Sequence, residues 1–460
     1  MPKAIQDNNN LYNLLSPLVQ FGTRCHYQTF VVRGRENLPT DGAYIIAPCH
    51  QQALMEPLAV LNFAPKPPVF LARADIFAQP TVRAILTFLK ILPVYRIRDG
   101  RDNLSKNDAI FEKSRNVLLD GYPLCLMAEG RHNDRHQLLP LVKGMFRIAG
   151  ETQRKLGDYP LYIVPTGIDF DNYERPYANL VVNIGKPIAV QPFMATFESN
   201  EPVALNQMRD ALTQALLPQM HDIRSKEHYD EIYTLCRALN KRQRKASGWR
   251  NSAWNRFRVR QMLSNKYDAM EREGDGRFET LMARSRDYAE RCRKLHFSVR
   301  TVPERWSLLA TLAALLGVAG VVAAMVAVPA VRWVVLFLLL CFPMPFLPTH
   351  LVTQKIIKDP QFRSSINFGI RFFLTIIYTI VIAIVVACND GLWMSRLADI
   401  GPWWGLVVVG LVHLEAMAAA SVVNGLKAVL RNSRYWLLCL FRPKAMRELE
   451  ACLDAMAAEK

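Results

Sequence analysis

The sequence lacks closely spaced cysteines and a secretory signal. Its nine cysteines are scattered singly among 460 residues, and none forms a short-spaced pair. The polar amino terminus is not followed by an apolar core with a small-residue cleavage site. These absences argue against a disulfide framework, a structural zinc site and a cleaved signal peptide. They favour a reducing compartment for the soluble part of the chain.

Acidic residues are few relative to basic ones. The chain has 40 Asp and Glu against 57 Lys and Arg, which gives a formal net charge of +17. Such an excess predicts an acidic partner, either nucleic acid or the anionic surface of a membrane. The sequence contains no zinc-finger, basic-zipper or RNA-binding signature. The hypothesis of a nucleic-acid-binding membrane protein is therefore supported by the charge alone. We expect membrane lipids, and not nucleic acid, to be the partner.

Long apolar runs are missing before Arg305 and frequent after it. The first run is uncharged and long enough to span a bilayer. Basic residues gather in the loops on one side of the runs. This predicts an integral membrane protein whose soluble domain faces the cytoplasm, with a bacterial inner membrane favoured. We expect about four transmembrane helices over residues 306–426, the second and fourth spanning or re-entrant, and a cytoplasmic C-terminal helix over 427–460. The runs are Trp306–Val328, Val331–Leu347, Asn367–Cys388 and Trp403–Leu426.

Residues 31–200 alternate between strand-like and helix-like segments, which predicts an α/β domain with a largely parallel or mixed sheet covered by helices. Residues 1–30 are expected to form an amphipathic helix at the membrane interface or against the soluble core. Residues 201–305 predict a basic helical region. The expected strands are 43–47, 69–72, 92–95, 124–127, 162–166 and 180–184, and the expected helices are 54–63, 81–89, 103–119 and 142–155.

His50 follows the first of these strands, and Glu56 lies six residues later. Reactive groups gather at the carboxyl ends of strands in open α/β sheets. An imidazole and a carboxylate at this spacing can act as a general base and the group that orients it. A helix-start histidine with a solvated glutamate is the other interpretation. Cys49 beside His50 is a rival nucleophile, although adjacent residues of an extended chain point to opposite faces.

Three further stretches carry charge or backbone features suited to an anion. In LPVYRIRDGRDN, Arg96 and Arg98 fall on one face of a strand and can clamp a phosphate. In LCLMAEGRHNDRHQLLPLVKG, a buried strand ends in Glu129, Gly130 and Arg131, and Lys143 precedes a helix start. The third stretch, LYIVPTGIDF, is a strand with Pro165 inside it. A metal site formed by His132, Asp134 and His136 is disfavoured, because no further ligand is placed.

Together, HQQALMEP, VYRIRDGRDN, AEGRH with LPLVKG, and IVPTGI resemble, in order and spacing, the glycerolipid (lysophospholipid) acyltransferase family. This family includes the glycerol-3-phosphate and 1-acylglycerol-3-phosphate acyltransferases, and the segment KIIKDPQFRSSINFG between apolar runs resembles its larger, multi-span members. The resemblance covers residues 31–190. Glu56 stands where the family usually has Asp, one place later. Ala128 and Arg131 stand where the family commonly has Pro and Thr or Ser.

The resemblance implies an O-acyltransferase that moves a fatty acyl group from a thioester to glycerol 3-phosphate or lysophosphatidate in phospholipid synthesis. It implies that His50 is the general base and Glu56 its orienting acid. Further implied roles are phosphate binding by Arg96, Arg98, Arg131 and Lys143, a pocket shaped by Glu129 and Gly130, and an acyl side shaped by Pro165.

It also implies no metal and no cofactor, with acyl-CoA or acyl carrier protein as co-substrate. Two alternatives remain open from the residues. The chain could acylate another lysolipid, or it could be a non-catalytic lipid-binding scaffold with a degenerate acyltransferase fold. The oligomeric state is not defined by the sequence.

Overall fold

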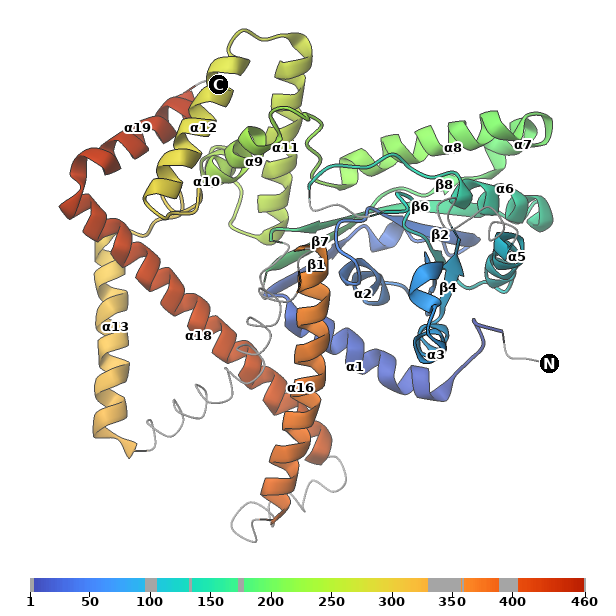
Figure 1. Ribbon diagram of the computed structural model, residues 1–460, viewed down its shortest axis with the longest axis horizontal. Helices are drawn as coiled ribbons and strands as arrows, with labels where there is room; N and C mark the ends of the chain where they lie inside the picture. The colour runs from blue at the N-terminus through green and yellow to red at the C-terminus, as the bar shows by residue number, and fades with distance from the viewer. Residues whose placement is uncertain are drawn as a thin grey trace. The chain divides into compact units, whose positions relative to one another are not determined.

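The structure, a computed structural model, describes residues 4–95, 106–131, 135–172, 178–329, 357, 360–388 and 404–458. The chain divides into two compact units (Figure 1). The first contains residues 1–222 and 360–365, and the second contains residues 223–359 and 366–460. The candidate site lies in the first unit.

An eight-stranded mixed sheet forms the centre of the first unit. Its strands follow the order β1-β7-β6-β2-β5-β3-β4, and β8 pairs with β6 outside this path. Five of the strand pairs are parallel, whereas β6 pairs antiparallel with β7 and with β8. The strands are β1 (Thr29–Arg33), β2 (Ala43–Pro48), β3 (Val69–Arg73), β4 (Ile91–Val94), β5 (Leu124–Cys125), β6 (Leu161–Phe170), β7 (Asn179–Ile184) and β8 (Ile188–Ala189).

The sheet confirms the predicted α/β class, and all six expected strands are present. Strand β2 is buried at every position because β5 and β6 flank it on both edges. Its register with β6 pairs Ala43 with Leu161 and continues to Pro48 beside Thr166. The parallel pairing brings the end of β2, where His50 follows, beside the middle of β6.

Helices lie on both sides of this sheet (Figure 1). The core contains β2 and β6 residues together with apolar side chains of α6 and α8, including Phe146, Ile148, Met208 and Leu212. The four expected helices are present with shifted ends. The helices of this part are α1 (Asn10–His26), α2 (Met55–Leu61), α3 (Pro80–Phe88), α5 (Lys106–Leu119), α6 (Gly144–Leu156), α7 (Met194–Ser199) and α8 (Glu201–Leu216).

The second unit is helical in the residues that the structure describes. Its core gathers buried side chains from α9, α11, α12 and α19, among them Leu235, Leu263, Tyr288 and Leu449. Its helices include α9 (Tyr229–Ala238), α10 (Asn240–Ala246), α11 (Ala253–Glu273), α12 (Phe278–Lys294), α13 (Leu308–Ala327), α18 (Trp404–Phe441) and α19 (Pro443–Ala458). Helix α16 (Pro360–Cys388) begins in the first unit and continues in the second.

Within the described ranges, one helix is long and apolar enough to cross a membrane. This is α13, with 20 residues, and only 6% of its apolar window is buried. The predicted second run, residues 331–347, lies outside the described residues. Residues of the third and fourth runs form parts of α16 and α18. The multi-span prediction is therefore not confirmed and stays a prediction.

Candidate active site

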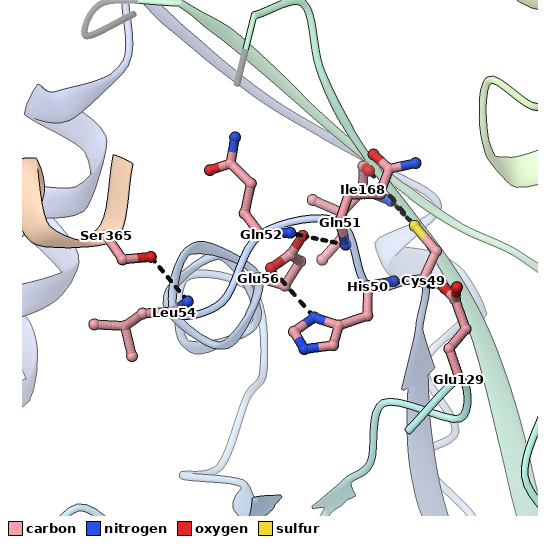
Figure 2. Close-up of polar contacts among 9 residues, drawn as sticks. All are labelled: Cys49, His50, Gln51, Gln52, Leu54, Glu56, Glu129, Ile168 and Ser365. Atoms are coloured by element: carbon pink, nitrogen blue, oxygen red, sulfur yellow. Dashed lines mark hydrogen bonds and ion pairs between the residues drawn. The ribbon is translucent and has the colours of Figure 1, made fainter. Parts of the chain in front are cut away.

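His50 and Glu56 meet just beyond the end of β2 (Figure 2). Nδ1 of His50 lies 3.5 Å from Oε2 of Glu56. The Glu56 side chain is fully buried, and the imidazole is 13% exposed. One ring nitrogen therefore faces a carboxylate, and the ring keeps some access to the surface. This is the arrangement of a general base held by an acid.

The Glu56 carboxylate is fixed by the chain that precedes its own helix. Its Oε1 accepts hydrogen bonds from the backbone N–H groups of Gln51 (2.9 Å) and Gln52 (2.5 Å). Glu56 is the second residue of α2, so its side chain turns back toward the helix start, as acidic residues of a first turn commonly do. The longer Glu side chain is thus accommodated, with one oxygen bound to the backbone and the other facing His50.

Glu129 holds His50 from the other side. Its Oε1 accepts a hydrogen bond from the His50 backbone N–H (2.7 Å), and its Oε2 accepts one from Leu139 (2.9 Å). Burial raises the pKa of the Glu129 carboxyl to about 8, the two backbone N–H bonds oppose this, and the nearby carboxylates Glu56 and Asp222 raise it further. Glu129 thus connects the loop after β5 to the residue that carries the candidate base.

Cys49 is inaccessible to solvent at the end of β2. It is fully buried, its Sγ accepts a hydrogen bond from Ile168 N (3.2 Å), and its own N–H donates to Thr166 O (3.1 Å). Burial first, and the nearby Glu129 second, hold the pKa of this thiol well above its usual range. Because the thiolate is the nucleophile of a cysteine enzyme, this environment disfavours Cys49 as the attacking group.

Gly130 and Arg131 follow Glu129 at the surface of this loop. Gly130 has a φ of +63°, a left-handed conformation that favours glycine, and both it and Arg131 are exposed. Lys143 is exposed at the position before α6. A backbone hydrogen bond from Val142 N to Ala128 O (2.7 Å) closes the loop near its base. The two cationic side chains are therefore placed in solvent at either end of one closed loop.

Of the remaining predicted site residues, some lie outside the described part of the chain and one lies inside the sheet. Arg96 and Arg98 lie outside the described residues, as do His132 and Asp134. Pro165 is buried within β6, opposite Ala47 of β2, and its carbonyl accepts from Gly185 N (2.8 Å). Its predicted role beside the acyl chain stays a prediction.

Some residues make specific contacts that could not be assigned from the sequence. Ser365, near the start of α16, accepts a hydrogen bond from Leu54 N (3.0 Å) through its hydroxyl (Figure 2). His136 meets Asp169 and His221 instead of the disfavoured trio. One available signal was a carboxylate at position 169 inside an otherwise apolar strand; position 221 has no comparable local signal.

Residues 29–169 match the sequence family described as Acyltransferase. This region of the chain is an acyltransferase-family domain, which confirms the resemblance drawn from the motifs at the level of the family. Among solved structures, the chain is similar to the 1-acyl-sn-glycerophosphate (LPA) acyltransferase PlsC from Thermotoga maritima. The sequence identity is 20% and the TM-score 0.31, over 44% of this chain and 79% of that chain. No curated protein matches the chain.

Proposed function

We propose that this protein is a membrane-bound O-acyltransferase that moves a fatty acyl group from a thioester donor to glycerol 3-phosphate or lysophosphatidate. The observation that carries the proposal is the 3.5 Å approach of Nδ1 of His50 to a buried Glu56 carboxylate inside the acyltransferase-family region, residues 29–169. A general base for a hydroxyl needs such a partner to fix its tautomer.

The reaction proceeds by direct transfer. The acceptor hydroxyl attacks the thioester carbonyl carbon, and Nε2 of His50 takes the hydroxyl proton as the new C–O bond forms. Glu56 stabilises the resulting imidazolium through Nδ1. The C–S bond then breaks, and the imidazolium returns the proton to the departing thiolate. The products are an ester and a free thiol, so the step requires no enzyme nucleophile.

Cationic side chains of the same motifs would bind the acceptor's phosphate. Arg131 and Lys143 are exposed at the ends of the loop that contains Glu129, and Arg96 and Arg98 complete the set by resemblance. Gly130 would let the backbone approach the headgroup, and Pro165 would border the acyl chain. Acyl-CoA or acyl carrier protein is the proposed donor.

We place the protein in a membrane, with the acyltransferase domain on the cytoplasmic side. Helix α13 supports the membrane location, because a largely apolar helix of 20 residues reaches across a hydrocarbon core and little of its apolar window is buried by protein. The uneven distribution of basic residues among the loops supports the cytoplasmic side. Its substrates and product would be membrane lipids. Tethering the site to the bilayer would therefore keep it close to them.

The test is turnover by purified full-length protein in nanodiscs. Acyl-CoA and acyl carrier protein donors are supplied with glycerol 3-phosphate, lysophosphatidate, lysophosphatidylcholine or no acceptor, and free thiol release is recorded. We expect release that depends on an acceptor bearing a phosphate monoester. Release with lysophosphatidylcholine alone would assign the chain to another lysolipid. Absence of release with every donor and acceptor would indicate a lipid-binding scaffold.

The matched variants are His50→Asn and His296→Asn. His296 is exposed and has a φ of +52°, a conformation that Asn tolerates. We expect His50→Asn to lose about 100-fold or more in kcat and His296→Asn to match the parent. A His50→Asn protein as active as the parent would remove the proposed base.

A further inference from the structure

Three buried side chains with metal-binding atoms converge in the interior of the first unit. His136 comes from the loop between β5 and α6, Asp169 from β6, and His221 from the segment after a short turn at Leu217–Gln219. Their ligating atoms all lie within 4.8 Å of one another. Each residue is at most 2% exposed, and all belong to the first unit. Segments far apart in sequence therefore meet at one point in the interior.

The geometry is close to that of an ion-binding site. Nδ1 of His136 lies 3.6 Å from Oδ1 of Asp169, and the two imidazole rings are 4.6 Å apart between centroids. Ligands about 2.1 Å from a tetrahedral ion are separated from each other by roughly 3.4 Å. The ligating atoms, which lie within 4.8 Å of one another, would therefore have to move closer by up to about 1.4 Å to bind one ion.

The buried carboxyl groups around these residues are compatible with a bound cation. Four carboxyl groups are buried in this part of the unit, those of Glu56, Glu129, Asp169 and Asp222. Asp222 adjoins His221, and its Oδ1 accepts a hydrogen bond from Leu138 N (2.7 Å). A buried carboxylate is costly unless it is hydrogen-bonded, paired or bound to a metal. Asp169 faces His136 in the structure, and a divalent ion would replace this pairing by direct ligation of both side chains.

We propose that His136, Asp169 and His221 bind a divalent transition metal ion, with Zn²⁺ as the ion that best fits the donor set. Two imidazole nitrogens and one carboxylate oxygen are ligands typical of Zn²⁺, whereas Mg²⁺ and Ca²⁺ select oxygen. Three protein ligands leave one coordination position for a water molecule. The site is separate from the acyl-transfer chemistry, which does not pass through it.

The ion would hold the loop that supports the candidate base. His136 lies in the same loop as Leu138 and Leu139, whose N–H groups bind Asp222 and Glu129. Glu129 in turn binds the backbone N–H of His50. An ion at His136 would therefore connect this loop to Asp169 of β6 and to His221 in the segment after α8. His136, Asp169 and His221 are positioning residues in this account.

The test begins with metal content. The untagged full-length protein is purified without chelator, dialysed against buffer containing Zn²⁺ and then against metal-free buffer, and analysed by elemental mass spectrometry. We expect about one Zn²⁺ per chain in the parent and in His228→Gln, a matched control in the second unit. We expect loss of that ion in His136→Gln, Asp169→Asn and His221→Gln. Co²⁺ in place of Zn²⁺ should give visible absorption that the same three variants lack.

These variants could fail to fold, so a second measurement uses the parent protein alone, with and without a chelator. We expect a chelator to lower the thermal unfolding midpoint and added Zn²⁺ to restore it, since an ion that binds only the folded state stabilises it. A parent protein with less than a tenth of an equivalent of metal after dialysis against Zn²⁺ would overturn the proposal. So would unchanged metal content in all three variants. A hydrogen-bonded cluster without an ion would give those results.

Discussion

The backbone N–H of His50 donates to Oε1 of Glu129 at 2.7 Å, so the residue that carries the candidate base is bound through its main chain as well as its ring. The ring faces Glu56 at 3.5 Å. The position of His50 therefore depends on two buried carboxylates from different motifs. Each of them also binds further backbone N–H groups, from Leu139 in one case and from Gln51 and Gln52 in the other.

Replacing Glu129 by Gln should reduce activity through the position of His50. At pH 9, above the raised pKa of Glu129, the carboxylate offers two acceptor oxygens where an amide offers one, and the NH₂ group of the amide would face an N–H donor. We expect kcat to fall about tenfold or more, with a smaller change in the KM for the thioester. Glu112→Gln, an exposed change on α5, is the control and should match the parent. Equal kcat values for Glu129→Gln and the parent would contradict this role.

In chelator-treated protein, the titration of Glu129 should make the stability of the folded state depend on pH. Burial raises its pKa from 4.5 in the unfolded chain to about 8 in the folded one. Between these values the folded state holds a proton that the unfolded state releases. Its stability therefore falls as the pH rises through this window. We expect the thermal midpoint of the parent to drop roughly 10 °C more than that of Glu129→Gln between about pH 5 and pH 8.5. Parallel midpoint curves for the two proteins would contradict the raised pKa.

Glu56 variants separate the charge of this residue from its geometry. In Glu56→Gln, one oxygen can still accept from Gln51 and Gln52, but the amide nitrogen would face Nδ1 of His50 and favour the wrong imidazole tautomer. We expect a loss of about 100-fold or more in kcat with a small change in thermal midpoint. Glu56→Asp keeps the charge on a shorter arm and should retain partial activity. A Glu56→Gln protein with full activity would show that the acid does not orient the base.

Cys49 should be dispensable for chemistry. Its thiol is buried, and burial holds its pKa well above the usual range. We expect Cys49→Ser to keep at least about a third of the parental kcat, because the hydroxyl can still accept from Ile168 N. Mass spectrometry after brief alkylation should show modification at other cysteines and none at Cys49. A fall in the kcat of Cys49→Ser of more than about a thousandfold would instead support a covalent mechanism with Cys49 as the nucleophile.

Gly167 permits a close backbone contact that supports β6. A Cβ at this position would lie 1.9 Å from the carbonyl oxygen of Gln219, which is a main-chain atom that cannot rotate away. We expect Gly167→Ala to cost about 3 kcal/mol or more in unfolding free energy, or to prevent folding. The control is Gly276→Ala, since nothing lies within 4 Å of a Cβ there and its φ is ordinary. Thermal unfolding of both proteins provides the measurement.

Much of the sheet could be predicted because its central strands are apolar and bounded by turn residues. Strands β1 and β8 are not among the predicted strands, since β1 lies at the edge of the sheet and is only partly buried and β8 has two residues. Strand β6 is longer than expected because it continues through Pro165 to Phe170, with β2 pairing along its first half and β7 along its second. A proline in the sequence indicates that one backbone N–H donor is missing. It does not show whether the residues after it still pair with a neighbouring strand.

The proximity of His50 and Glu56 could be predicted because both lie within one strand-to-helix turn. The contact of Glu129 with His50 could not, because it ends on a backbone N–H group and any residue type supplies one. The meeting of Asp169 with His221 depends on how the chain returns to β6 after α8. That return is a tertiary contact, and local patterning does not reveal it.

The register of β2 with β6, in which Ala43 pairs with Leu161, has a consequence for the order of folding. The strand that leads to His50 cannot complete its ladder until more than a hundred further residues have been synthesised, and such long-range pairings form slowly. During translation, one edge of this fully apolar strand would remain open. A nascent chain stalled before β6 would therefore be a preferred substrate for chaperones and a source of aggregation.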